Sequence, residues 1–378
     1  TQTLTSGGTG AGKDFNSLTV DGTTNTVQLA TNAAGIAGTL TIALGDTLDM
    51  NGQGLSVGTL SNDGTLQLQG GEPLTIGTMD TNSGLVKYVG GGTSPYTIVD
   101  FGGTDYFNLE IAGGGAETFQ LGASALTVNG MLTNTSGLFD TNAQDITAAG
   151  LTVAGGTFNN GSDAGTWDIG TGGVSISGGG TLIGTSGTMT VEGDFANAAT
   201  FTHNSGTVDF DLAAAGTQQL TSNANQFSTL THSGTGTLQL VDGVSAAGTI
   251  TNSAGDFDTA GQSVTAAGLT VSGGTFNSTS SAGAWDIGTS GVSISGGGTL
   301  IGTSGTMTVE GDFANAATFT HNSGTVQFDG SGTQTLTSGG TGAGKDFNSL
   351  TVDGTTNTVQ LATNAAGIAG TLTIALGD

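Results

Sequence analysis

The sequence predicts an all-β protein, a parallel β-helix or β-solenoid with no significant helix. Three observations support this fold class. Short strings that alternate apolar and polar residues fill the chain, Gly accounts for 72 of 378 residues while Pro accounts for 2, and long segments are repeated. Alternation with a period of two is typical of strands with one buried face, and no stretch keeps a 3.6-residue period. The Gly and Asn residues between the strings suit tight turns that need left-handed backbone conformations.

The chain consists of related repeats. Four similar strings begin at the phenylalanines Phe15, Phe107, Phe227 and Phe347. They divide the chain into repeat units of about 15–106, 107–226 and 227–346. Residues 1–46 return unchanged as 333–378, so 1–332 is one complete super-repeat. We therefore expect 1–378 to be one continuous β-solenoid and a segment of a longer tandem array.

The repeat lengths predict the size of one coil. The four phenylalanines are separated by 92, 120 and 120 positions along the chain. These lengths fit whole numbers of coils of about 23–24 residues, or about 16 coils in all, because solenoids gain and lose whole coils. The usual rule for parallel connections predicts a right-handed solenoid.

Each string of the first repeat unit is bounded by Gly, Asn, Asp or Ser. The strings are 18–20, 27–29, 39–42, 55–57, 66–68, 74–76 and 85–88. This unit also holds both prolines, Pro73 and Pro95, and all three tyrosines, so it is the least regular part of the chain.

The second and third repeat units are close copies, and 173–208 is identical to 291–326. Because side chains alternate across a strand, one face of each string can be assigned to the core. The predicted core positions are Leu40, Ile42, Leu151, Val153, Val174, Ile176, Leu182, Val208, Phe210, Leu269, Val271, Val292 and Ile294. Equal positions in successive coils should lie above one another, so we also expect Phe195, Phe201, Phe313 and Phe319 to stack.

The charge of the chain limits its partners. It has 29 acidic residues, three Lys and no Arg, with a net charge of −26. A surface this acidic cannot neutralise phosphates, which excludes nucleic acid, and it disfavours anionic membranes. No apolar run approaches the length of a membrane helix, so we expect no membrane insertion. The chain has no cysteine.

One run of residues carries a resemblance to a known class of proteins. The run GDFANAATFTHNSGTVQFDG at 311–330, followed by GTQTL at 332–336 and FNSLTV at 347–352, resembles the repeats of giant secreted bacterial surface proteins. These are the filamentous-haemagglutinin and autotransporter-type adhesins, and the resemblance extends over essentially the whole chain. It implies a β-solenoid, export to the extracellular space or bacterial cell surface, and a role in surface fibres, adhesion or biofilm matrix.

A polysaccharide-binding or polysaccharide-cleaving β-helix module is the alternative function. Glycoside hydrolysis needs two carboxylates at a set separation. Asp209 and Asp211 share one strand face, but the matching residues of the next repeat are Gln327 and Asp329. A catalytic site should be unique, whereas nearly every polar cluster here is duplicated. We therefore expect no catalysis, no catalytic residues and a solvated face at this aspartate pair.

The sequence contains residues of two kinds that can bind metal ions. Asp46, Asp49 and Asn51 form an oxygen-rich turn that makes them weak calcium candidates, although the spacing of an EF-hand is not met. The acidic surface could also bind calcium nonspecifically. The histidines His203, His321 and His232 have no second ligand at a suitable spacing. We expect exposed histidines at strand ends and no other cofactor.

Two repeated tryptophans, Trp167 and Trp285, allow two interpretations. They could be exposed platforms on which sugars stack, or packing anchors that are partly buried. An ice-binding face would need Thr-x-Thr strings in nearly every coil, and the strings at 39–41, 188–190 and 306–308 do not recur that regularly.

The prediction is therefore the structural shaft of an extracellular fibre, surface filament or large adhesin. Near-identical coils let such an array extend with an unchanged cross-section. We expect the partner to be the protein itself, through end-to-end continuation or lateral bundling, with host or matrix glycans as possible further ligands.

Overall fold

The computed structural model describes residues 1–92, 94–159, 161, 164–277, 282–354 and 356–378. Over these residues the regular structure consists of β-strands, with no helix. The strands pair in parallel and form a β-solenoid of about 17 turns, which confirms the predicted fold class. No helix of this described part could therefore cross a membrane.

The chain is organised in two compact bodies. The N-terminal body comprises Thr1–Gly187 with Ala199–Phe201, and the C-terminal body comprises Thr188–Ala198 with Thr202–Asp378. The strands of the N-terminal body are β1 (Gln2–Leu4), β2 (Leu18–Val20), β3 (Thr26–Leu29), β4 (Ala34–Ile42), β5 (Thr47–Asp49), β6 (Leu55–Asn62), β7 (Thr65–Leu68), β8 (Leu74–Thr78), β9 (Leu85–Tyr88), β10 (Tyr96–Thr97), β11 (Asn108–Ala112), β12 (Thr118–Gln120), β13 (Leu126–Ser136), β14 (Leu138–Asp140), β15 (Ile146–Val153), β16 (Thr157–Phe158), β17 (Trp167–Ile176) and β18 (Thr181–Ile183).

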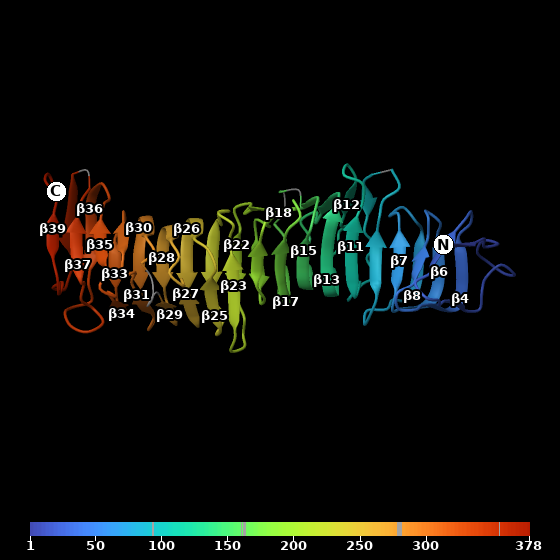
Figure 1. Ribbon diagram of the computed structural model, residues 1–378, viewed down its shortest axis with the longest axis horizontal. Helices are drawn as coiled ribbons and strands as arrows, with labels where there is room; N and C mark the ends of the chain where they lie inside the picture. The colour runs from blue at the N-terminus through green and yellow to red at the C-terminus, as the bar shows by residue number, and fades with distance from the viewer. Residues whose placement is uncertain (93, 160, 162–163, 278–281, 355) are drawn as a thin grey trace. The chain divides into compact units, whose positions relative to one another are not determined.

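The C-terminal body continues the same pattern. Its strands are β19 (Thr188–Val191), β20 (Phe195–Asn197), β22 (Thr207–Phe210), β23 (Thr217–Thr221), β24 (Thr229–His232), β25 (Thr237–Leu240), β26 (Val244–Asn252), β27 (Asp256–Asp258), β28 (Val264–Val271), β29 (Thr275–Asn277), β30 (Trp285–Ile294), β31 (Thr299–Ile301), β32 (Thr306–Val309), β33 (Phe313–Asn315), β34 (Thr318–Thr320), β35 (Thr325–Phe328), β36 (Gly332–Thr337), β37 (Ser349–Val352), β38 (Asn357–Leu361) and β39 (Leu372–Ile374). The remaining strand, β21 (Thr200–Thr202), has residues in both bodies. In Figure 1, β26, β28 and β30 stand side by side, as their pairing requires.

Coil length varies more than the repeat lengths predict. In the C-terminal body Ile250 pairs with Leu269, and Leu269 in turn pairs with Val292. The first of these two coils is therefore shorter than the second, so the uniform coil length expected from the repeats is wrong for part of the chain. The number of turns, about 17, nevertheless agrees with the predicted count of about 16. Register shifts, such as the one between Ala246 and Thr249, absorb the difference in length.

The core follows the period-two pattern of the sequence. In β7 the side chains of Leu66 and Leu68 are buried, and those of Thr65 and Gln67 lie on the other face. All of the predicted core positions, the aliphatic ones as well as Phe210, are buried. In parallel strands held in register, equal residues lie above one another, and the rings of Phe257 and Phe276 stack with centroids 4.6 Å apart.

The expected phenylalanine stack has a different geometry where the structure shows it. Phe313 and Phe319 are in contact, with centroids 5.2 Å apart and ring planes at 77°. Phe347 lies 5.3 Å from each of them. The three rings thus form a cluster in which Phe313 meets the other two edge to face and Phe319 and Phe347 are tilted at 43°, an arrangement that aromatic quadrupoles favour over a face-to-face stack.

The core also contains polar residues that join neighbouring coils. Asn134 and Asn252 are fully buried; Ile111 and Val153 pair with Asn134 in the ladder, and His232 and Val271 pair with Asn252. Each amide Nδ2 donates a hydrogen bond to a backbone carbonyl of the next coil, at Gly155 (3.2 Å) and Gly273 (3.1 Å) respectively. These bonds satisfy backbone carbonyls at the corners that have no N–H partner in the strand ladder.

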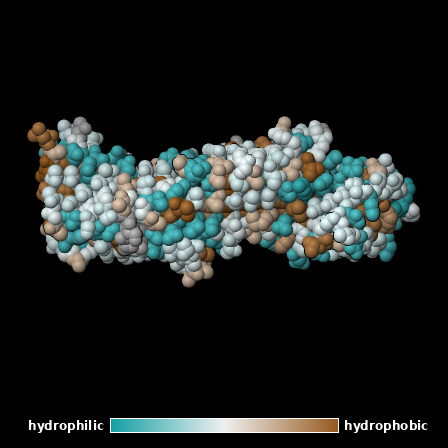
Figure 2. Space-filling model, viewed as in Figure 1, coloured by the Kyte–Doolittle hydropathy of each residue, from teal (hydrophilic) through white to brown (hydrophobic). Residues whose placement is uncertain are grey.

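The two identical segments, 1–46 and 333–378, have different surroundings. Leu40 and Ile42 are fully buried, because Leu60 and Asn62 of β6 pair with them. Their counterparts Leu372 and Ile374 in β39 are 52% and 60% exposed. Figure 2 shows apolar residues gathered at the end of the C-terminal body that carries the C-terminus. The same sequence therefore becomes core or surface according to whether another coil covers it.

This difference predicts unequal effects of one substitution made at two equivalent sites. Leu40→Ala should destabilise the coils around it by roughly 2–5 kcal/mol, because it leaves a cavity in a packed core. Leu372→Ala should cost at most about 1 kcal/mol, since its side chain is half exposed. Urea titration with hydrogen–deuterium exchange of β4, β6 and β39 measures both effects. Equal losses at the two sites would contradict the assigned packing.

Candidate functional site

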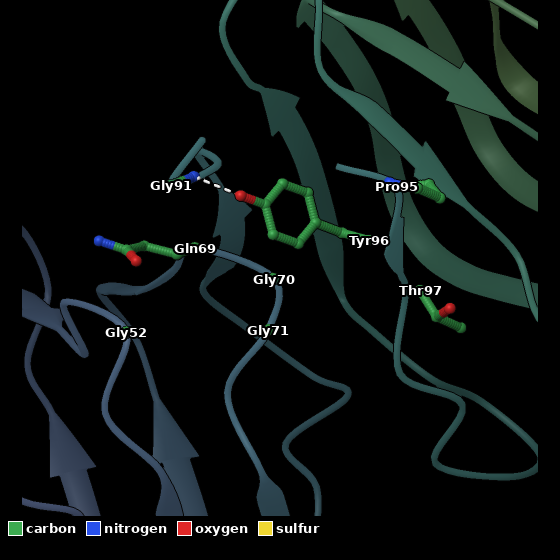
Figure 3. A pocket seen from close by; sticks show the side chains of 8 residues that line it. All are labelled: Gly52, Gln69, Gly70, Gly71, Gly91, Pro95, Tyr96 and Thr97. Carbon is green, nitrogen blue, oxygen red and sulfur yellow. Dashed lines mark hydrogen bonds between the residues drawn. The ribbon is translucent and has the colours of Figure 1, made fainter. Parts of the chain in front are cut away.

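A groove of about 450 Å³ in the N-terminal body is the candidate functional site. Its lining comes from the three stretches of chain that follow β5, β7 and β9 and consists of Gly52, Gln69, Gly70, Gly71, Gly91, Pro95, Tyr96 and Thr97. Figure 3 shows the side chains of Gln69, Tyr96 and Thr97 along a backbone made largely of glycine. Its volume lies within the range of roughly 300–1,000 Å³ that is usual for small-molecule sites.

Glycine keeps the groove open. Gly70 has a φ of 112°, a left-handed conformation that other residues rarely adopt. A Cβ at this position would lie 2.9 Å from Cβ and Cγ of Tyr96, so a side chain here would displace the tyrosine. A Cβ at Gly52 or Gly91 would meet the amide of Gln69, with Oε1 at 2.8 Å or 2.5 Å. The sequence thus leaves the backbone itself as the floor of the groove.

Tyr96 is held firmly in the wall of the groove. Its ring stacks on Phe119 with centroids 5.1 Å apart and ring planes at 26°. Its hydroxyl oxygen accepts a hydrogen bond from the backbone N–H of Gly91 at 2.7 Å and lies 3.4 Å from Glu117 Oε1. The side chain is only 6% exposed, so its ring shapes the wall of the groove and its hydroxyl forms a polar edge there.

Two carboxylates support the corners that line the groove. Glu72 accepts hydrogen bonds from the backbone N–H groups of Gln69 and Gly70. Glu117 accepts hydrogen bonds from three backbone N–H groups, at Gly91, Gly92 and Gly114. The bond from Gly92 is the main cause that holds the pKa of Glu117 below its ordinary value. Both carboxylates therefore act as acceptors for turn backbone that would otherwise have no partner.

Gln69 is the polar side chain of the groove that is not committed elsewhere. Its backbone N–H bonds to Glu72, but its side-chain amide has no hydrogen-bond partner among the described residues. The amide oxygen lies close to both Gly52 and Gly91, which places it between two corners of the groove. A side-chain amide in this position can donate and accept at the same time.

The predicted calcium candidates have structural hydrogen bonds. Asp46 is 1% exposed, and its carboxylate accepts bonds from the N–H groups of Gly22 (2.8 Å) and Asn25 (2.6 Å) in the preceding coil. Asp378, its counterpart in the second copy, accepts the same two bonds from that copy. These aspartates therefore join successive coils in both copies.

The other two candidates, Asp49 and Asn51, are hydrogen-bonded to each other. The two carboxylate oxygens of Asp49 accept from Asn51 N–H (2.9 Å) and Gln28 Nε2 (2.7 Å), and the amide of Asn51 donates to Leu29 O. Among the described residues, no three His, Cys, Asp or Glu side chains form a group that could hold a metal ion.

The tryptophans are packing anchors. Trp167 and Trp285 are each 1% exposed, so the sugar-stacking interpretation is wrong for both. Each ring meets a phenylalanine edge to face, Phe158 at 5.4 Å and Phe276 at 5.3 Å. The alternation Trp-Asp-Ile at the start of β17 and β30 already places the indole on the same face as a buried isoleucine.

His232 was expected to be exposed, and it is fully buried. Its Nδ1 lies 2.7 Å from Asn252 Oδ1, and its Nε2 has no hydrogen-bond partner among the described residues. Asp209, expected on a solvated face, is half-buried and accepts a bond from Ser233 Oγ at 2.9 Å. Burial lowers the pKa of His232 and raises the pKa of Asp209, since it disfavours the charged form of each.

A second buried polar cluster was missed by the sequence reasoning. Asp105 is 1% exposed, accepts bonds from Phe101 N–H and Thr127 N–H, and has a pKa that burial raises. Nearby, the hydroxyls of Tyr88 and Tyr106 lie 3.1 Å apart, and burial raises the pKa of Tyr88 to about 12. The signal that could have found this cluster, and the groove, was the confinement of every Tyr and Pro to one repeat unit.

Comparison of the chain with protein-family models, with curated proteins and with solved structures found no match in any of the three. Its function is therefore argued from its own residues.

The buried histidine predicts a pH-dependent stability. Its folded pKa is lowered, so below pH ~6.5 the unfolded chain binds a proton that the folded chain resists, and stability falls as pH falls. The raised pKa of Asp209 acts in the opposite direction, because protonation of that carboxyl favours the folded state. The loss of stability from the histidine begins at about pH 6.5, the ordinary pKa of imidazole, and the aspartate offsets it only where the folded Asp209 takes up its proton.

The test compares the unmodified chain with His232→Val between pH 8 and pH 5.5. Valine is the residue that the repeat itself places at the matching positions Val20 and Val352. Urea midpoints should fall less with pH in the variant than in the unmodified chain. An unchanged pH slope would show that His232 does not titrate as its burial implies.

Proposed function

We propose that this chain forms the structural shaft of an extracellular fibre, surface filament or large adhesin. The observation that carries the proposal is the in-register stacking of similar side chains from successive coils. Ile250, Leu269 and Val292 pair in succession within the C-terminal body. Each coil there presents the same kind of residue to the coil before it and to the coil after it. Such coils can be added in series without a change in cross-section.

The repeated apolar pair of residues 1–46 supports the same proposal. Leu40 and Ile42 are buried where Leu60 and Asn62 of the next coil pair with them, and the identical residues recur at Leu372 and Ile374. This pair therefore has the composition of an inter-coil contact. We propose that such faces associate with further coils of the same protein, end to end, and that shafts bundle laterally into homopolymers.

The resemblance to secreted bacterial adhesin repeats and the acidic composition support a location outside the cell. A net charge of −26 keeps extended molecules soluble and apart unless specific contacts overcome their repulsion. The proposal includes no catalytic step. The polar residues that the sequence singled out serve mainly as hydrogen-bond partners between coils.

The test is the length of molecules that contain one, two and three copies of the super-repeat 1–332. At ~4.8 Å per coil, each further copy of about 15 coils should add on the order of 70 Å to the particle length seen by electron microscopy. Compact particles whose length does not grow in equal steps would contradict a shaft. Protease treatment of intact source cells should remove the native protein if it is on their surface.

A further inference from the structure

The glycine-floored groove at Gln69 and Tyr96 differs from the repeated corners of the chain. Its residues lie between 52 and 97, a segment that the 378 residues contain once. The corners that recur serve the solenoid by joining coils. A corner that occurs once per super-repeat, and is kept open by glycine at four positions, can serve a task besides the joining of coils.

The chemistry of the groove excludes several kinds of ligand. Its lining contains no Lys or Arg, and Glu72 and Glu117 lie beside it, which is unsuitable for an anion. The carboxylate oxygens already accept hydrogen bonds from backbone N–H groups, which makes them weaker ligands for a cation. Backbone and polar side chains dominate the lining, which gives little for a purely apolar ligand to contact.

What remains suits a neutral ligand rich in hydroxyl groups. The amide of Gln69 can donate and accept, and its position between two glycines leaves it accessible from the groove. Thr97 also belongs to the lining, but Figure 3 shows its side chain directed away from Gln69. Pro95 is exposed and offers an apolar ring to the C–H face of a sugar.

We propose that this groove binds a short stretch of a neutral polysaccharide. The side-chain amide of Gln69 hydrogen-bonds its hydroxyls, Pro95 contacts a sugar face, and the glycine backbone allows the chain of sugars to lie close. A peptide would need apolar pockets for its side chains, which this lining does not provide. One such site per super-repeat would place saccharide contacts at regular intervals. The groove proposal does not depend on the shaft proposal, because the length test above does not involve these residues.

The experiment screens the full chain against immobilised neutral oligosaccharides (hexamers of glucose, N-acetylglucosamine, xylose and mannose) and against anionic hexagalacturonate, with short uncharged peptides as a further probe. Any hit is then measured by isothermal titration calorimetry. Retention of one or more neutral hexamers, with no retention of hexagalacturonate, is the expected result. Retention of peptides alone, of the anionic probe alone, or of nothing would overturn the proposal.

Two variants with matched controls locate the binding. Gly91→Val adds a side chain that must displace the Gln69 amide, and binding should be lost; Gly115→Val adds the same bulk where nothing lies within 4 Å, and binding should be kept. Gln69→Leu should weaken binding about three- to tenfold, the usual value of one or two hydrogen bonds. Gln67→Leu, on the outer face of β7, should have no effect.

All four variants should show the strand content and melting temperature of the unmodified chain, because none alters a core position. If Gly91→Val proves misfolded, Gln69→Leu against Gln67→Leu still decides the question. Saccharide binding that survives both Gly91→Val and Gln69→Leu would place the ligand elsewhere and overturn the assignment of the groove.

Discussion

The parallel hydrogen-bond ladder between successive coils is the constraint on which the rest of this structure depends. One coil buries too little apolar surface to be stable alone, so each must pair with the next over its whole length. In-register pairing places Leu on Leu and Phe on Phe, as at Leu132–Leu151 and Phe257–Phe276. It also explains why a leucine of identical sequence context is buried at position 40 and half exposed at position 372.

The ladder leaves backbone N–H and C=O groups at the corners without strand partners. Acidic and asparagine side chains of the chain supply hydrogen-bond partners for them. N–H groups at turns are taken up by carboxylates, as at Asp46, Glu72, Glu117 and Asp145. Carbonyls that remain are taken up by buried asparagines. Lys87 pairs with Glu110 at 3.0 Å, but most acidic side chains need no basic partner because backbone donors serve instead. A strongly acidic chain with almost no basic residues is compatible with this way of closing its turns.

The fold could be predicted from the sequence because strand alternation and exact repeats are local signals. The same alternation, applied consistently, would also have placed His232 beside Leu230 and Trp167 beside Ile169 in the core. Coil length could not be predicted, because register shifts within long strands such as β13 and β26 change it from one coil to the next. The confinement of every Tyr and Pro to one repeat unit marks that unit as unusual, but it does not give the lining of the groove, since stacking brings together three separate stretches of chain there.

Register between coils is the central claim, and engineered cysteine pairs measure it directly because the chain has no cysteine of its own. Thr251 and Thr270 pair across β26 and β28 and lie on the outer face. Thr251→Cys with Thr270→Cys should form a disulfide rapidly on mild oxidation, because paired strand residues lie within the usual Cα separation of about 4.4–6.8 Å. Thr251→Cys with Ser272→Cys, two residues out of register, should form it far more slowly. Equal rates, or faster closure of the offset pair, would contradict the in-register solenoid.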